Sequence, residues 1–503
     1  MRKSILLAAL SLATLAGHLG CADVDDSDSL DETSHDTKES VLGCATGAGG
    51  GTTGGGSTTD GAGAACNYPQ WKSGTQYHTG DIVLYKGSPY VATHDNPGYE
   101  PTISTWFWSP SSVCSGGSGG TSTTGSGGAG SGTTSSSSSG GGTGSGGAGS
   151  GSSTGKWVSG YYIGYQQNLY PTGAIDWSGL THLFVGRVVP NSNGSLNTTF
   201  DIDATNGPIL AKKLVQLAHQ NGKKAVVMLG GSGVLGGWQG AASAQNRGTF
   251  VQNLKQLAQD YGFDGFDLDW EPISTGDQPA FKALAQALRA AMPSTLLAVP
   301  VGWVGMNNAN VGSFYGEIAP IFDQINIMSY GMAGAWSGWQ SWHSAALYGE
   351  TSTTPTSVDV NVKAYMSAGV PAAKIGVGIA FYGTCWSSPV NQPKSSLNGS
   401  SVVADDNVMS YDNIMKSYYS DADRRWDATA RVPYLGFSSA HGPQGCTFVS
   451  YEDPQSILEK GAYVKQKGLG GAIVWTINQG YRSSQPLGQQ NPLMQALKQG
   501  FLQ

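Results

Sequence analysis

Residues 263–272 read FDGFDLDWEP and alternate acidic with large apolar side chains. Successive side chains of a β-strand point to opposite faces, so Asp267, Asp269 and Glu271 should share one face. The Cα atoms of Asp269 and Glu271 would lie roughly 6.5 Å apart, close enough for like-charge repulsion to raise one pKa. The stretch therefore predicts a wall of three acids, one of them protonated near neutral pH and able to act as a general acid. The plainer alternative is a half-buried strand whose acidic face is solvated.

On both sides of this stretch, from Lys156 to the end of the chain, apolar runs alternate with helical segments at 207–221, 249–261 and 280–292. This order is typical of parallel strands joined by right-handed crossovers. We expect an α/β fold, a closed (β/α)8 TIM barrel over residues 156–503, in which Glu271 ends the fourth strand at the face where active sites lie. The eight runs are residues 157–163, 182–189, 225–229, 263–270, 296–301, 325–330, 375–381 and 472–477.

Residues 1–155 have a different composition. A basic start and a short apolar run predict a signal peptide over residues 1–20. Leu19-Gly20-Cys21 resembles a bacterial lipoprotein box, so we expect an extracellular protein, either released or tethered to the outer surface through a lipid on Cys21. An acidic and then Gly/Ser/Thr-rich tether at 21–65 and a Gly/Ser/Thr-rich linker at 115–155 have too few apolar groups to fold. Between them, the aromatic-rich segment 66–114 predicts a small all-β module.

The net charge of −7 belongs to one segment of the chain. The acidic stretch from Asp23 to Glu39 accounts for all of it, so the remaining residues sum to zero. Such a chain lacks the basic surface of a nucleic-acid-binding protein and suits an uncharged partner such as a polysaccharide.

Six cysteines in an exported chain favour disulfides. Cys66–Cys114 and Cys385–Cys446 each bracket one compact segment, and we predict these two pairs. Cys21 would carry the lipid, which leaves Cys44 as a lone thiol for which we have no physical account.

The spacing of the acids restricts the reaction. Retaining glycosidases usually place two carboxyl groups on opposite sides of the scissile bond. Here Asp269 and Glu271 come from one strand and approach the sugar from the same side, so the nucleophile must come from elsewhere. A 2-acetamido group can supply its own carbonyl oxygen while the neighbouring carboxylate stabilises it. The pattern therefore predicts an N-acetylglucosamine substrate and substrate-assisted catalysis.

The chain from Lys156 to Gln503 resembles glycoside hydrolase family 18 chitinases, whose DxxDxDxE signature is matched by Asp264, Asp267, Asp269 and Glu271. The resemblance implies that Glu271 protonates the glycosidic oxygen and that Asp269 contacts the acetamido nitrogen. It also implies that Asp267 is a buried acid that tunes Asp269, and that Asp264 is structural. The partners implied are chitin and chitooligosaccharides.

Further positions follow the family pattern. Met328-Ser329-Tyr330 matches the sixth-strand motif, which implies a catalytic hydroxyl on Tyr330 directed at the acetamido oxygen. Trp475 resembles the residue on which the reacting sugar stacks, and Tyr161 the first-strand Tyr near the buried acid. The substrate-binding residues expected from the resemblance are Trp475, Tyr161, Met328 and Tyr382.

The chain departs from the family pattern at two positions. Met228 stands where the family has a Ser that bonds the buried acid, and Gly331 stands where an Asp is usual. Fewer hydrogen bonds to the ionised carboxylates would alter the pH optimum. The long segment before Phe448 predicts a small α+β insertion between strands seven and eight.

Five tryptophans fall where barrel loops should face the cleft, and core packing is the alternative for each. The polar, glycine-containing spacing of 336–342 favours an exposed stacking surface, so we expect substrate contacts at Trp336 or Trp339. The other three are Trp238, Trp303 and Trp342.

The module at 66–114 resembles chitin-binding modules of carbohydrate-binding families 5 and 12 through Trp71, Tyr77, Gly80-Asp81, Tyr90, Pro101 and Trp106. His94-Asp95 occupies the family's exposed aromatic pair, so chitin binding would use other rings or be weakened. We expect binding through Trp71, Tyr99 or Trp108, with core packing as the alternative for each.

Two other functions share parts of this pattern. An endo-β-N-acetylglucosaminidase acting on N-glycans has the same motif, although the chitin-binding-like module and the Trp-rich loops argue against it. A non-catalytic chitin-binding lectin on the same barrel usually lacks the acid that corresponds to Glu271. No residues have metal-ligand or phosphate-loop spacing, so we expect no metal and no cofactor. We also expect a monomer.

Overall fold

The computed structural model describes residues 68–72, 75, 77, 78, 80–92, 101, 108–111 and 155–503. The predicted signal peptide, tether and linker, together with Cys21, Cys44, Cys66–Cys114, His94-Asp95 and Tyr99, lie outside the described residues.

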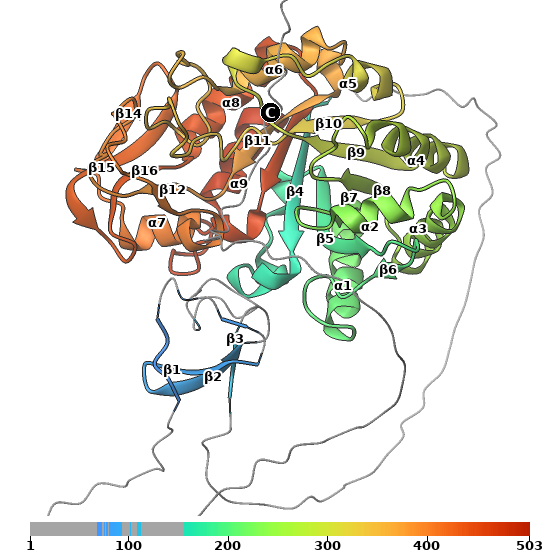
Figure 1. Ribbon diagram of the computed structural model, residues 1–503, viewed down its shortest axis with the longest axis horizontal. Helices are drawn as coiled ribbons and strands as arrows, with labels where there is room; N and C mark the ends of the chain where they lie inside the picture. The colour runs from blue at the N-terminus through green and yellow to red at the C-terminus, as the bar shows by residue number, and fades with distance from the viewer. Residues whose placement is uncertain are drawn as a thin grey trace, which may run out of the picture. The chain divides into compact units, whose positions relative to one another are not determined.

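Eight parallel strands close into a barrel, which confirms the predicted (β/α)8 fold (Figure 1). The first strand pairs with both the second and the last, so the ring has no free edge. A two-residue strand, β6 (Leu196–Asn197), adds antiparallel to the second. The barrel strands are β4 (Trp157–Ile163), β5 (His182–Pro190), β7 (Lys224–Gly230), β8 (Gly265–Asp269), β9 (Leu296–Val301), β10 (Gln324–Ile327), β11 (Ile375–Ala380) and β17 (Gly471–Trp475).

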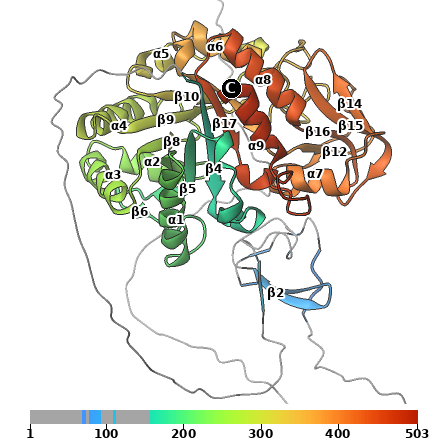
Figure 2. The ribbon, with the colours of Figure 1, turned by 180° about the vertical axis from the view of Figure 1, so that it is seen from behind.

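Helices surround the barrel strands, as both ribbon views show (Figures 1 and 2), and their buried residues belong to the core between helices and sheet. In α1, the spacing of Ala211, Leu214, Val215 and Ala218 gives a stripe that packs on the sheet. Gly262 ends α3 in the left-handed conformation, with φ of 80°. The α-helices of the barrel are α1 (Asn206–Gln220), α2 (Leu235–Ala241), α3 (Arg247–Tyr261), α4 (Gln278–Ala291), α5 (Phe314–Ile318), α6 (Val358–Ser367), α8 (Pro454–Gln466) and α9 (Pro492–Leu497).

Short helical turns complete the loops. Seven are 3₁₀ segments: η1 (Gly164–Leu169), η2 (Thr172–Ala174), η3 (Trp177–Gly179), η4 (Met306–Asn308), η5 (Ala372–Lys374), η6 (Asp406–Met409) and η7 (Ile477–Gly480). The chain ends in a π-helical turn, η8 (Lys498–Leu502). No helix in the described ranges is long and apolar enough to cross a membrane.

An insertion between β11 and β17 forms a five-stranded antiparallel sheet with one α-helix, as expected. The disulfide Cys385–Cys446 joins its first and last strands, which confirms that predicted pair. Its strands are β12 (Thr384–Trp386), β13 (Val402–Ala404), β14 (Arg424–Asp427), β15 (Val432–His441) and β16 (Cys446–Ser450), and its helix is α7 (Tyr411–Ser417).

The small module contains the antiparallel strands β1 (Ile82–Tyr85), β2 (Ser88–Ala92) and β3 (Trp108–Pro110). Trp108 is only 1 % exposed and packs edge-on against Tyr77, at 5.1 Å between ring centroids. The prediction that Trp108 binds sugar is therefore wrong, because its ring belongs to the core of the module. Trp71 is half-buried at the edge of the same cluster.

Apolar side chains fill the barrel domain in two layers. The larger layer lies between the sheet and the helices and includes Phe266 and Leu268 of β8. The smaller one fills the barrel interior and is formed by Tyr161, Ile163, Phe184, Val226, Met228, Ala298 and Ile473. Because β8 contributes apolar residues to the outer layer, its alternate residues must face inward.

Candidate active site

The alternation in β8 places its acids inside the barrel. Asp267 is 0 % and Asp269 3 % exposed, while Glu271 follows the end of the strand and is half-buried. The alternative of a solvated acidic face is wrong, since two of the three carboxyl groups are buried. Asp264 lies at the other end of the strand, where it bonds Lys224 and the backbone of Ala225, and is structural as predicted.

Hydrogen bonds fix the end of β8. The Tyr161 hydroxyl donates to Asp267 Oδ2 at 2.7 Å, whereas the Oδ1 atoms of Asp267 and Asp269 have no partner in the described structure. The Asp269 carbonyl oxygen accepts from the backbone N–H of Gly231 at 2.7 Å and from the indole of Trp238 at 3.1 Å. The backbone is thus held firmly, while one buried oxygen of each carboxylate has no hydrogen-bond partner among the described residues.

The three carboxyl groups share protons. Burial raises the pKa of Asp267 to about 7, although the hydrogen bond from Tyr161 opposes the rise. Burial and then the charges of Glu271 and Asp267 hold the pKa of Asp269 well above its ordinary range. Burial also raises the pKa of Glu271, against a hydrogen bond with Asp269 and the charge of Arg187. The expected rise in pKa is confirmed, with burial rather than repulsion as its largest cause.

A cavity of about 210 Å³ opens beside Glu271. It is lined by Ile163, Tyr165, Arg187, Asp201, Met228, Gly231, Ser232, Glu271 and Trp475. A larger hollow of about 580 Å³ lies against α6, but its lining, within 309–313 and 364–368, has neither an acid nor an aromatic ring. The chemistry therefore belongs to the smaller cavity.

The other predicted site residues surround the carboxylates. Trp475 ends β17 and lines the cavity, with its ring centroid 5.3 Å from that of Tyr161. Burial raises the pKa of Tyr330 well above its ordinary value, so its hydroxyl keeps its proton and can donate. Tyr382 lies 6.2 Å from Tyr330 between ring centroids, and Met328 packs against the barrel interior.

Tyr161 needs a correction. It is 1 % exposed, and its hydroxyl is bonded to Asp267. It holds an acid in place and does not line the cavity, so the prediction that it contacts substrate is wrong.

Three of the five cleft tryptophans form a cluster in which Trp336 is exposed and Trp303 and Trp339 are half-buried. The ring of Trp336, 42 % exposed, lies 4.7 Å from Trp339 and 5.7 Å from Trp303 between centroids. Trp238 and Trp342 are fully buried, so core packing holds for these two.

The Met228 departure has a visible effect. Its side chain packs inside the barrel and offers no hydroxyl, which accords with the unpartnered Oδ1 of Asp267. Gly331 adopts φ of 61°, a conformation that disfavours the Asp usual in the family.

Sequence reasoning missed several residues of the site. Arg187 lies within β5, bonds Asp201 at 3.1 Å and donates to the Gly230 carbonyl at 2.9 Å. A cation inside an apolar strand was the signal that could have found it. Asp406 of the insertion accepts from Gln479 at 2.7 Å, and burial raises its pKa to about 6. No local signal marks Asp406, because the fold alone brings it to the barrel.

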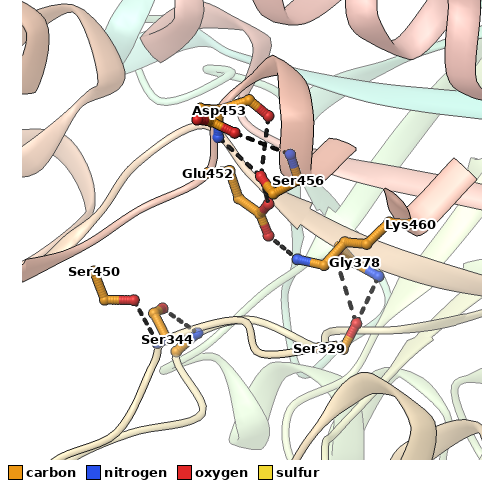
Figure 3. Close-up of polar contacts among 9 residues, drawn as sticks. Ser329, Ser344, Gly378, Ser450, Glu452, Asp453, Ser456 and Lys460 are labelled. Carbon is orange, nitrogen blue, oxygen red and sulfur yellow. Dashed lines mark hydrogen bonds and ion pairs between the residues drawn. The ribbon is translucent and has the colours of Figure 1, made fainter. Parts of the chain in front are cut away.

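A second buried carboxylate lies away from the cavity (Figure 3). Glu452 forms an ion pair with Lys460 and accepts from the Ser456 hydroxyl at 2.5 Å. Asp453 caps α8 reciprocally with Ser456, and Arg424 bonds Asp453 at 2.6 Å. This network fixes the start of α8 and joins it to the insertion.

No group of three His, Cys, Asp or Glu side chains within the described ranges could hold a metal ion. The residues at the cavity offer proton transfer, hydrogen bonding and aromatic stacking. A closed parallel barrel with a carboxylate row at the end of one strand defines a glycoside hydrolase of the (β/α)8 class.

Within that class, residues 158–480 match the model of glycosyl hydrolases family 18, and the chain belongs to this family. A probable endochitinase of Caenorhabditis elegans is 33 % identical over 48 % of this chain and 42 % of its own length. Chitinase 1 of Aphanocladium album is 30 % identical over 56 % and 68 %. The group IV chitinase structure of Ostrinia furnacalis superposes with a TM-score of 0.57 at 24 % identity, covering 69 % of this chain and all of that one.

The chain spans less than half the length of two of the curated relatives that it matches: it covers 42 % of the probable endochitinase and 38 % of Chitinase A1 of Niallia circulans.

Proposed function

We propose that the protein is a chitinase that hydrolyses β-1,4 bonds between N-acetylglucosamine units by substrate-assisted, retaining catalysis. The carrying observation is the row formed by Asp267, Asp269 and Glu271, in which a group with a raised pKa lies beside the cavity. Asp201 also lines the cavity but is bonded to Arg187, so the acetamido oxygen of the sugar is the better nucleophile. Family membership and chitinase relatives support this reaction.

In the proposed reaction, Glu271 donates a proton to the glycosidic oxygen while the acetamido carbonyl oxygen attacks the anomeric carbon. Asp269 accepts a hydrogen bond from the acetamido N–H, and Tyr330 donates one to the acetamido oxygen. The leaving sugar departs with the proton. Water then opens the cyclic intermediate, with Glu271 now acting as the base, so the configuration is retained.

The remaining surfaces suit a long, neutral substrate. Trp475 would stack under the reacting sugar, and the Trp303, Trp336 and Trp339 cluster would stack under neighbouring units. Met328 and Tyr382 would complete the pocket around the acetamido group.

Glu271→Gln tests the assignment, because the amide keeps the shape of the side chain but cannot donate the proton. We expect kcat on N-acetylglucosamine oligomers to fall by about 10³-fold or more, with oligomer binding retained in calorimetry. Asp264→Asn is the control, since Asp264 lies at the far end of the strand. A Glu271→Gln variant with most of its activity would contradict the proposal.

The two alternative functions have tests of their own. Faster release of sugar from an N-glycoprotein than from chitin would favour the endo-β-N-acetylglucosaminidase. Binding without turnover by the unaltered chain would favour the lectin.

We further propose that residues 66–114 bind chitin, with Trp71 and Tyr99 as contacts, and that the protein acts outside the cell, released or held by a lipid on Cys21. The aromatic composition of the module and the basic, apolar N-terminus support these roles. Deleting 66–114 should reduce activity on insoluble chitin and leave soluble oligomers almost unaffected, because the module adds only local concentration. Equal activity of both forms on powdered chitin would make the module a spacer.

A further inference from the structure

Arg187 lies where the cavity meets the carboxylate row. Its Nη1 atom donates to the carbonyl of Gly230 at 2.9 Å and to that of Ser232 at 3.4 Å. Its Nε atom donates to both carboxylate oxygens of Asp201, at 3.2 and 3.1 Å. The guanidinium therefore grips the turn after β7 while Asp201 fixes its orientation.

The gripped turn also holds the acids. The N–H of Gly231 donates to the carbonyl oxygen of Asp269, and Ser232 lines the cavity together with Glu271. A Cβ atom on Gly231 would lie 2.9 Å from Arg187 Nη1 and 3.7 Å from Asp269 Oδ2, so the cation and the carboxylate flank the same glycine. A continuous set of hydrogen bonds thus runs from Asp201 through Arg187 and the turn to the backbone of Asp269, two residues before Glu271.

Asp201 is held in an unusual backbone conformation. Phe200 and Asp201 both adopt left-handed φ values, 49° and 55°, although neither is a glycine. Phe200 is 1 % exposed and belongs to the core, which secures this conformation. Left-handed backbone at consecutive non-glycine residues persists where the surrounding structure enforces it, and it clusters at functional sites. Here it directs the Asp201 carboxylate at Arg187.

We propose that Arg187, fixed by Asp201, is a positioning residue that holds the turn 230–232 against the end of β8 and whose charge sets the pH range in which the carboxylate row works. The proposal rests on the proposed function.

The other titratable groups at the site, besides the three acids themselves, are Tyr161 on β4, Tyr330 after β10, Tyr382 after β11, Asp406 of the insertion and Asp201, which pairs with Arg187. Burial raises the pKa of each of these tyrosines well above its ordinary value, so they stay neutral. Arg187 is the positive charge that lowers the pKa of both Asp269 and Glu271, in opposition to burial. Its removal should raise both pKa values.

The test compares full-length Arg187→Gln and Arg187→Lys with the unaltered chain on a soluble N-acetylglucosamine oligomer from pH 3 to 9. Without the charge, both limbs of the kcat/KM profile should move to higher pH by about one unit, because Glu271 keeps its proton longer and its partner ionises later. In Arg187→Lys, the charge remains but the two-carbonyl grip is lost. The limbs should then stay in place while kcat falls about tenfold.

Arg289→Gln is the matched control. Arg289 is also 28 % exposed, also bonds an Asp and also donates to backbone carbonyls, but it lies on α4, away from the row. The Arg289→Gln variant should lose about as much stability as Arg187→Gln. The limbs of its kcat/KM pH profile should remain those of the unaltered protein. Limbs that stay unchanged in a folded Arg187→Gln variant would overturn the proposal. If Arg187→Gln does not fold, Arg187→Lys provides the test. Its charge is retained, so a shift of about one pH unit in the limbs of its kcat/KM profile would show that the charge does not set them.

A readout independent of turnover separates this proposal from the proposed function. Carbon-13 NMR of protein labelled at Glu and Asp carboxyl carbons follows the titration of Glu271 directly, assigned by its loss in Glu271→Gln. Inactivity of the unaltered chain on every N-acetylglucosamine oligomer would refute the proposed function only. A Glu271 midpoint that does not rise in Arg187→Gln would refute the role of Arg187.

Discussion

At the end of β8, Asp267 and Asp269 are buried without an ion pair in the described part of the chain, whereas at the start of α8 the equally buried Glu452 is bonded to Lys460 and Ser456. The paired carboxylate satisfies the ordinary requirement for burying a charge. The carboxylate row instead contains buried oxygens without hydrogen-bond partners and has raised pKa values. Both features come at a cost in stability. The comparison shows that one domain contains two kinds of buried carboxyl group. The paired Glu452 joins segments of the chain, and the unpaired Asp267 and Asp269 have raised pKa values.

The largest effect should come from breaking the paired side. Lys460→Met leaves Glu452 buried without its cation, and we expect the free energy of unfolding to fall by about 3–5 kcal/mol in chemical denaturation. Lys460→Met combined with Glu452→Gln should recover most of the loss, because no unpaired charge remains. A single variant as stable as the unaltered protein would show that Glu452 is not held as a charged partner.

The unpaired Asp267 should make stability fall as pH rises, which is the opposite of what a paired carboxylate does. The pKa of Asp267 is raised from near 4 to about 7, so the folded state keeps a proton that the unfolded chain loses across this window. Stability of the unaltered protein should therefore fall as pH rises from 4 to 7. Asp267→Asn, whose amide oxygen can still accept from Tyr161, should avoid roughly 3 kcal/mol of this fall.

Asp264→Asn is the control for this experiment, measured by the same denaturation series. Burial alone would raise the pKa of Asp264, but hydrogen bonds from Lys224, Ala225 and His219 outweigh it and lower the pKa. Asp264 therefore contributes stability above pH 4 that is lost as pH falls, so Asp264→Asn should be most harmful near neutral pH. Equal pH profiles for the two variants would remove the distinction between the paired and unpaired acids.

The smallest effect should appear at the tryptophan cluster, which contains no charge. Trp336→Ala should weaken binding of a long N-acetylglucosamine oligomer by about 5–30-fold, because one stacking face is lost. Its unfolding free energy should change by less than about 1 kcal/mol, since the ring is 42 % exposed. Trp342 is fully buried, and its indole N–H donates to the carbonyl of Thr356. Trp342→Phe should therefore lower the unfolding free energy and leave oligomer binding almost unchanged. Unchanged oligomer affinity in Trp336→Ala would remove this cluster from the binding surface.

Local patterns predicted the barrel and the acids well, for a physical reason. The alternation in 263–272 is set by strand geometry, so the inward direction of Asp267 and Asp269 follows from the sequence alone. Strand ends were less certain: β10 was expected to reach Tyr330 but ends at Ile327. Tyr330 lies in the loop beyond it, because the pattern of apolar residues does not report where strand pairing stops.

What the sequence could not provide are contacts between distant segments. Arg187 and Asp406 reach the site through strand pairing and through the insertion. The charge of Arg187 is unusual in its apolar strand, but nothing near Asp406 in the sequence marks that residue. Trp108 and Trp342 show the same limit in the other direction, because composition cannot separate an aromatic that binds sugar from one that packs in a core. Only the structure shows that these two rings are buried.

The insertion after β11 has a consequence for how such a chain can change. Its first and last strands, β12 and β16, pair antiparallel, and Cys385–Cys446 ties them together, so the polypeptide leaves the barrel and returns to it at adjacent points. The barrel is thus connected to this subdomain through a narrow, covalently closed neck. Segments beyond the neck can therefore change in length without altering the order of the eight strands, provided that contacts with the barrel such as the bond from Arg424 to Asp453 are kept.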